Sequence, residues 1–133
     1  MKPALVVIDT NVLVSALWSN NGNPRKILDL LLNGKIKPCY GSGIIKEYEA
    51  VLSRPHFQFT LSEVSSLLSF IKATGISVVP APTSVQFIDE DDRKFYEVAK
   101  CCNAVLITGN LKHFPKDQDI LAPVDYIKIY NSL

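Results

Sequence analysis

The sequence predicts an α/β fold, a three-layer α/β/α sandwich whose central sheet is mainly parallel and has four to five strands. Residues 4–8 form an unbroken apolar run, which is typical of a strand that helices cover on both faces. Strand and helix signals then alternate along the rest of the chain. No linker, repeat or low-complexity tract interrupts them, so we expect a single domain over residues 1–133.

The first elements follow from hydrophobic periodicity and from helix-end residues. Apolar residues at helical spacing predict a helix over 11–18, which the polar loop 19–23 ends. Pro24 suits the first turn of a second helix, and Asn33-Gly34 is typical of a helix end. The stretch 36–40 then predicts the second strand.

The middle of the chain repeats this order of helices and strand. A helix over 42–53 ends at Arg54-Pro55, because a residue before proline avoids the helical conformation. Apolar residues spaced by three and four predict the next helix, over 61–73. Residues 76–79 predict a short third strand, and the turn 80–82 follows it.

The last third of the chain completes the alternation. The acidic stretch 89–92 opens a helix, and the apolar stretch 104–108 predicts the fourth strand. A loop over 109–118 leads to a short fifth strand over 119–122. Pro123 begins the final helix.

The composition limits the classes of function. A chain of 133 residues that is 47% apolar can bury a substantial core, and a net charge of +1 argues against binding nucleic acid by bulk electrostatics. Asp9 interrupts the first apolar run too early for a signal-peptide core, and no other segment could span a bilayer. Cys39, Cys101 and Cys102 lack metal-ligand spacing, so we expect core thiols in a reducing, cytoplasmic protein without membrane contact.

Polar residues follow the predicted strands on one edge of the sheet. In right-handed strand–helix–strand units, the carboxyl ends of strands and the amino ends of helices share that edge. The residues expected there are Asp9, Glu47, Asp89, Asp91, Asp92, Thr108 and Asn110. Clustered carboxylates repel one another unless a cation binds, and ligands that are all oxygen favour Mg²⁺ or Mn²⁺ over zinc.

These residues lie in motifs that resemble a known family. Residues 7–16, Val-Ile-Asp-Thr-Asn-Val-Leu-Val-Ser-Ala, are similar to the opening of PIN-domain ribonucleases, and most of all to the toxin branch of toxin–antitoxin systems. The resemblance extends over almost the whole chain. Further motifs in family order are Gly22-Asn23-Pro24, Lys46-Glu47-Tyr48, Leu52-Ser53-Arg54-Pro55, the stretch 89–95, Leu106-Ile107-Thr108-Gly109-Asn110 and Pro123-Val124-Asp125-Tyr126-Ile127.

The resemblance implies a PIN-like, Rossmann-like fold and a set of metal-binding acids. Asp9 corresponds to the first metal-binding aspartate, and Glu47 corresponds to the acid on the third helix. Asp92 corresponds to the third acid, a role that Asp89 or Asp91 could share. The family often has a fourth acid where this chain has Asn110. That difference leaves the site with one negative charge fewer. The site would then bind a second metal ion less tightly, or Asn110 would hold a metal-bound water.

The resemblance also implies the chemistry and the partners. One or two Mg²⁺ or Mn²⁺ ions would activate water to hydrolyse RNA phosphodiester bonds. Thr10, Asn11 and Thr108 would position water or phosphate by hydrogen bonds. Apart from the resemblance, Lys112, His113 and Lys116 lie just beyond the fourth strand and beside the predicted site, so we expect them to flank the RNA path. A toxin of this branch would be a cytoplasmic homodimer that a small antitoxin protein inhibits.

Each residue also has a purely structural explanation. Asp9 or Asn11 could cap the following helix, the acids 89–92 suit the positive end of a helix dipole, and Glu47 could be a solvated helix residue. Convergence on one sheet edge favours an active site over these explanations. Two other functions stay open: a PIN domain with an impaired site that binds RNA or protein, and a Mg-dependent phosphatase or receiver. The second normally requires another aspartate at the position of Asn11.

Two apolar features lie outside the predicted site. Trp18 precedes a polar loop, where it could stack on a base or contact a partner, although core packing is the preferred interpretation. The stripe over 61–71 belongs to the core or, in part, to a dimer interface.

Overall fold

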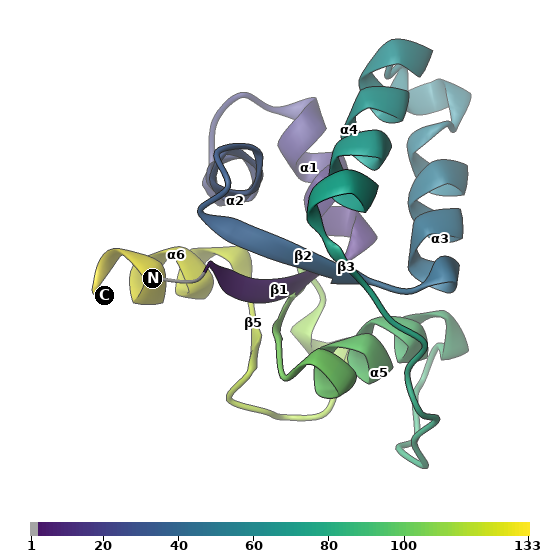
Figure 1. The fold of residues 1–133 in the computed structure, drawn as a ribbon, viewed down its shortest axis with the longest axis vertical. Coiled ribbons are helices and arrows are strands. Elements are labelled where there is room, and N and C mark those ends of the chain that lie inside the picture. Colours follow the sequence, from purple (N-terminus) through teal and green to yellow (C-terminus); the bar gives the residue numbers. More distant parts are fainter. Residues whose placement is uncertain (1–2) are drawn as a thin grey trace.

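The computed structural model describes residues 3–133, and over these residues the chain forms one five-stranded sheet surrounded by six α-helices (Figure 1). The strands lie in the order β3-β2-β1-β4-β5, and every neighbouring pair is parallel. The predicted α/β/α class is therefore confirmed. The strands are β1 (Ala4–Ile8), β2 (Ile36–Tyr40), β3 (Ile76–Ser77), β4 (Val105–Ile107) and β5 (Ile120–Leu121).

The helices cover both faces of the sheet. Figure 1 shows α1, α2 and α4 on one side and α5 on the opposite side, while α6 packs against α2. The helices are α1 (Thr10–Trp18), α2 (Asn23–Leu32), α3 (Ser42–Leu52), α4 (Leu61–Thr74), α5 (Arg93–Cys102) and α6 (Pro123–Asn131). In the part of the chain described, none of these helices is long and apolar enough to cross a membrane.

Strand β1 is the centre of the sheet, as its apolar run predicts. Val6, Val7 and Ile8 are buried, because β2 and β4 flank the strand and helices cover both faces. The register pairs Ile8 with Ile107 of β4. The order in which strands are added to the sheet switches sides at β1, since β2 and β3 lie on one side of it and β4 and β5 on the other. Open α/β sheets place their ligands at this switch point, next to the carboxyl ends of the strands.

The observed elements differ from the predicted ones mainly at their ends. The third strand stops at Ser77, although the Val78 amide still donates to the Tyr40 carbonyl at 2.9 Å. Pro80 has no amide hydrogen with which to extend that ladder. The acids of the 89–92 stretch form a 3₁₀ turn, η2 (Glu90–Asp92), before α5 begins. Two further 3₁₀ turns, η1 (Pro55–Phe57) and η3 (Leu111–His113), lie in segments predicted as irregular.

Two predictions about burial are wrong. Trp18 does not pack in the core: it is the last residue of α1 and 60% exposed. All three cysteines are free, but Cys101 is exposed near the end of α5, whereas Cys39 is buried and Cys102 half-buried. Most of the apolar stripe on α4 belongs to the core, because Val64, Leu67, Leu68 and Ile71 are buried, whereas Leu61 at its start is exposed.

Candidate active site

Asp9 lies directly after β1, where the ladder to β4 continues through a hydrogen bond from its amide to the Ile107 carbonyl at 2.9 Å. The side chain is 5% exposed. Asp9 occupies the N-cap position of α1, but its carboxylate caps no backbone amide. Instead Oδ2 accepts hydrogen bonds from Thr108 Oγ1 at 2.7 Å and from Asn11 Nδ2 at 3.3 Å. Helix capping therefore does not explain this acid.

Asn11 and Thr108 join the carboxyl ends of β1 and β4 around that carboxylate. Thr108 Oγ1 accepts from the Asn110 amide at 3.0 Å, and Asn11 Oδ1 accepts from the Gly109 amide at 3.1 Å. A Cβ on Gly109 would lie 3.2 Å from Asn11 Oδ1, so glycine permits this close approach. The hydrogen bonds of Asn11 and Thr108 are thus made to the acid and to the adjacent backbone. Their predicted role in positioning water or phosphate stays a prediction.

Glu47 enters the same region from the second turn of α3. Thr10 Oγ1 donates a hydrogen bond to Glu47 Oε2, and Lys94 Nζ lies 2.7 Å from Glu47 Oε1. The next residue, Tyr48, is buried, and its hydroxyl donates to the Ile8 carbonyl at the end of β1. This bond fixes α3 against the strand that carries Asp9. Sequence reasoning missed Lys94, because nothing local in α5 indicates a contact with α3.

The acidic stretch places its carboxylates in different environments. Asp89 caps η2 by accepting a hydrogen bond from the Asp91 amide at 3.0 Å, and Asp91 is exposed. The Asp92 side chain is 14% exposed, and His113 Nδ1 lies 3.2 Å from its Oδ2. Within residues 3–133, no group donates a well-directed hydrogen bond to this buried oxygen. Burial thus distinguishes Asp92 from its neighbours as the acid with an unsatisfied ligand atom.

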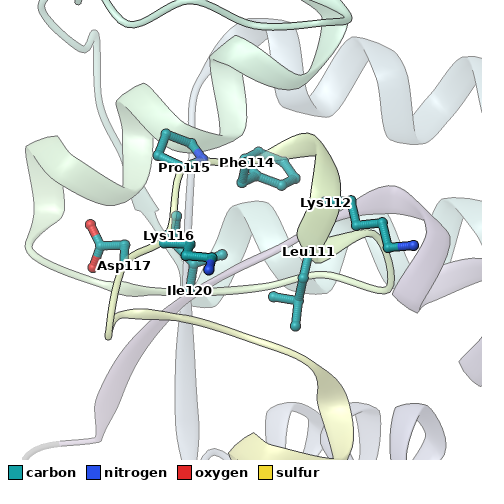
Figure 2. Close-up of a pocket in the computed structure, with 7 residues that line it drawn as sticks. All are labelled: Leu111, Lys112, Phe114, Pro115, Lys116, Asp117 and Ile120. Atoms are coloured by element: carbon teal, nitrogen blue, oxygen red, sulfur yellow. The ribbon is translucent and has the colours of Figure 1, made fainter.

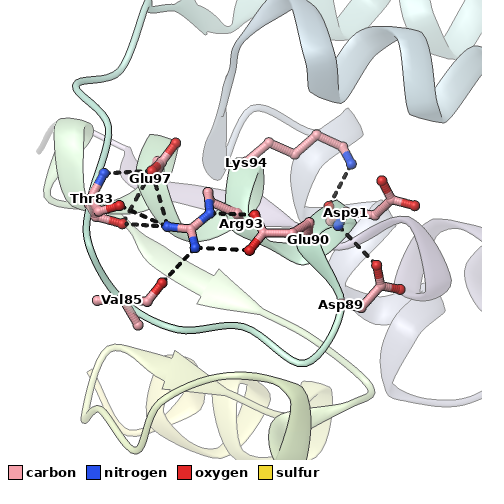
Figure 3. Close-up of polar contacts among 8 residues, drawn as sticks. All are labelled: Thr83, Val85, Asp89, Glu90, Asp91, Arg93, Lys94 and Glu97. Carbon is pink, nitrogen blue, oxygen red and sulfur yellow. Dashed lines mark hydrogen bonds and ion pairs between the residues drawn. The ribbon is translucent and has the colours of Figure 1, made fainter.

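Arg93 braces the stretch that carries these acids (Figure 3). Its guanidinium donates to the carbonyls of Thr83 at 2.8 Å and Val85 at 2.7 Å, and Nε lies 2.7 Å from Glu90 Oε2. Glu97 Oε2 accepts from the Thr83 amide at 2.6 Å. Because one side chain holds both the incoming loop and η2, the acidic turn has a defined position against α5.

The predicted acids line one pocket of about 410 Å³, called here the acid pocket. The pKa of Asp9 is raised to about 6, chiefly by burial and also by the nearby Asp92 and Glu47 carboxylates, while the Thr108 hydrogen bond opposes the rise. The pKa of Asp92 is also raised by burial, while the His113 ring opposes this shift. The lining residues are Asp9, Thr10, Asn11, Val14, Ser15, Glu47, Val51, Phe57, Asp89, Asp91 and Asp92.

The chemistry of the pocket fits a hard divalent cation. Its candidate ligands are all oxygen atoms, Asp92 Oδ2 is buried without a hydrogen bond, and mutual repulsion raises the pKa of Asp9. Across residues 3–133, however, no three His, Cys, Asp or Glu side chains are arranged closely enough to bind an ion. In this arrangement Lys94 and Thr10 hold Glu47, so the structure supports the donor set and not a formed metal centre.

The other predicted residues gather in two neighbouring pockets. Lys112 and Lys116 line a cavity of about 500 Å³, called here the lysine pocket (Figure 2). Its remaining lining residues are Leu111, Phe114, Pro115, Asp117 and Ile120. Asn110 and His113 line a pocket of about 400 Å³, and Asn110 does not line the acid pocket. Of this group only His113 contacts a predicted acid, so the metal-binding role of Asn110 stays a prediction.

Comparison with known proteins agrees with this architecture. A family model described as PIN domain matches residues 5–112, which include all the residues that line the acid pocket. The chain is also 37% identical over 132 residues to an uncharacterized protein, MJ1680, of Methanocaldococcus jannaschii. That alignment covers 95% of this chain and 81% of the relative.

Proposed function

This chain belongs to the PIN-domain family, and on that premise we propose that its acid pocket hydrolyses RNA phosphodiester bonds with the help of Mg²⁺ or Mn²⁺. PIN domains are generally nucleases and typically use divalent metals. One observation carries the proposal. Asp9, Glu47 and Asp92 come from distant parts of the sequence, yet they line one pocket, where burial and the neighbouring carboxylates raise the pKa of Asp9.

The three acids would hold one or two ions between them. A bound divalent ion lowers the pKa of water and stabilises the charge that develops on the phosphoryl oxygens. The chain's own residues orient the carboxylates for that task. Thr108 and Asn11 fix Asp9, and Thr10 fixes Glu47. The Lys94 ammonium lies beside Glu47, where its charge favours the approach of an anionic phosphate.

A nuclease assay with matched variants tests this proposal. Single-stranded RNA is incubated with Mn²⁺ or Mg²⁺ and either the parent protein, Asp9→Asn, Glu47→Gln or Glu49→Gln. Glu49 is exposed on the same helix as Glu47 and lies outside the acid pocket, so its substitution controls for lost surface charge. We expect cleavage by the parent and by Glu49→Gln only. Equal cleavage by Asp9→Asn would overturn the assignment of the site.

A second candidate is a PIN domain that binds RNA or protein without cutting. The ion pair between Lys94 and Glu47 favours it, as does the amide of Asn110 in place of a fourth acid. RNA binding that needs no metal and gives no cleavage would establish this function. The phosphatase or receiver alternative is weaker, because Asn11 occupies the required aspartate position and binds the Gly109 amide.

The biological role is proposed from the resemblance to the toxin branch. A toxin would act in the cytoplasm as a homodimer, and a small antitoxin would bind over the acid pocket. Co-expression with the product of a neighbouring small reading frame tests this role. Co-purification together with loss of nuclease activity is expected, whereas an active nuclease that binds no such protein would contradict it.

A further inference from the structure

An exposed aromatic cluster formed by Trp18, Phe57 and Phe59 has no part in the metal chemistry. The Trp18 ring lies 5.4 Å from the Phe57 ring and 6.2 Å from the Phe59 ring between centroids, nearly perpendicular to both. Phe57 and Phe59 are themselves stacked at 5.5 Å. The two phenylalanines are half-buried, but Trp18 is 60% exposed. The cluster therefore presents an indole to solvent on a preformed aromatic support.

The aromatic cluster is continuous with the acid pocket. Phe57 lines that pocket together with Val14 and Ser15 of α1. Trp18 follows these residues by four and three positions, so it lies on the same face of the helix, one turn further along. A strand of RNA with one phosphate at the acids can therefore extend along this face of α1 to Trp18, at the far end of the helix from Asp9.

The surroundings of the aromatic cluster favour a nucleic acid over a protein partner. Exposed polar residues lie next to the two phenylalanines: Arg54 and His56 precede Phe57, and Gln58 separates it from Phe59. The polar loop 19–22 follows Trp18. Sites for single strands combine aromatic rings with basic groups that contact the backbone, and stacking tolerates any base because every base has a π-face.

We propose that Trp18, supported by Phe57 and Phe59, stacks on an unpaired nucleobase of an RNA strand that extends from the acid pocket. The inference rests on the proposed function, and it adds a base-stacking subsite outside the acid pocket. Bases in a duplex are stacked on one another and their faces are not available to the indole. Trp18 is then a substrate-binding residue that gives the nuclease its preference for unpaired RNA.

Trp18 is the only tryptophan in the chain, so its fluorescence reports on this site alone. The probe is a single-stranded RNA of about ten nucleotides containing all four bases, titrated in EDTA to prevent cleavage. We expect saturable quenching. An RNA duplex of equal length and inorganic polyphosphate, which carries charge without bases, should quench at least about fivefold less at equal phosphate concentration.

Substitutions separate stacking from the other contributions to binding. By anisotropy of a labelled RNA, Trp18→Leu should weaken binding by about 5- to 100-fold, whereas Trp18→Phe should retain most of the affinity. Ile129→Ala, at a half-exposed position of α6, should bind like the parent. In the presence of Mn²⁺, Trp18→Leu should raise KM and leave kcat within a few-fold, because Trp18 does not contact the metal ligands.

Three results would overturn the stacking proposal. If Trp18→Leu binds and cleaves single-stranded RNA as the parent does, the proposed nuclease function survives and the stacking role falls. If Trp18→Leu instead changes the oligomeric state at unchanged RNA affinity, the cluster is a protein interface. If the parent neither binds nor cleaves RNA with Mn²⁺ or Mg²⁺, both proposals fall together.

Discussion

The acid pocket and the lysine pocket show two ways of building a cavity on one sheet edge. The acid pocket draws its side chains from Asp9 after β1 and from α1, α3, η1 and the turn before α5, and hydrogen bonds join several of these segments. The lysine pocket is larger, but one continuous segment, 111–120, supplies its lining, which is largely apolar. Volume alone would therefore not select the pocket that we propose for the chemistry. The feature that supports the acid pocket is the convergence of distant polar groups that constrain one another.

The short turn η3 connects the two pockets. His113 contacts Asp92 of the acid pocket, with 3.2 Å between Nδ1 and Oδ2. The preceding residue, Lys112, lines the lysine pocket. We therefore expect substitutions in the acid pocket to change the rate of cleavage, and substitutions in the lysine pocket to change RNA affinity.

The largest expected effect concerns the third acid. Asp92→Asn should lower kcat by about 10²- to 10³-fold with little change in KM, because it removes charge that acts on the transition state. Asp91→Asn, at an exposed position in the same turn, should change kcat much less. Steady-state cleavage assays measure both. A greater loss in Asp91→Asn would move the metal-binding role to that residue.

The next effect is on stability, and it has a defined pH dependence. Because the pKa of Asp9 is raised to about 6 in the folded protein, its stabilising contribution is present below about pH 4 and is lost as pH rises through 6. Without divalent metal, Asp9→Asn should therefore stabilise the protein at pH 7 by up to about 3 kcal/mol. Urea unfolding in EDTA measures this difference, which should shrink toward pH 4. An equal or less stable variant at pH 7 would contradict it.

A smaller effect is expected where Arg93 braces the acidic turn. Arg93→Gln should lower the free energy of unfolding by more than the control below, since it removes hydrogen bonds to the carbonyls of Thr83 and Val85. Amide exchange over residues 83–91 should accelerate at the same time. Arg25→Gln, which breaks an exposed pair with Asp29, is the control and should cost less than about 1 kcal/mol. If both variants lose the same free energy of unfolding, the contacts of Arg93 with the loop carbonyls contribute no more to stability than an exposed ion pair does.

The smallest effect is expected in the lysine pocket. Lys112→Gln with Lys116→Gln should weaken RNA binding several-fold and reduce the salt dependence by about 0.7 per lost phosphate contact. The cleavage rate at saturating RNA should stay unchanged. Lys128→Gln, at an exposed position of α6, provides the control. An unchanged salt dependence would show that RNA does not pass over this pocket.

The sequence was most informative where local pattern and topology act together. The apolar run before Asp9 predicted the central strand, and the right-handed crossover rule predicted that Glu47 and Asp92 would lie near its end. Neither inference needed a detailed side-chain position. The Thr108 bond to Asp9 spans 99 residues, and only its neighbourhood could be anticipated.

The features that sequence reasoning missed depend on tertiary contacts. Lys94 has the pattern of an ordinary exposed helix residue, and its pairing with Glu47 exists only because α3 and α5 pack together. Likewise, the exposure of Trp18 reflects where α1 ends relative to η1, which the helical periodicity does not specify. Register within the acids 89–92 was also undetermined, because all four side chains are acidic and only burial separates Asp92.

The 99-residue separation between Asp9 and Thr108 also has a consequence for synthesis of the protein. The ribosome releases the strand that carries Asp9 well before the strand that carries Thr108 exists. During that interval the carboxylate lacks both its hydrogen-bond donor and the neighbouring strand on that side. If the pocket cleaves RNA, the nascent chain therefore lacks the complete pocket until β4 and Thr108 have been synthesised.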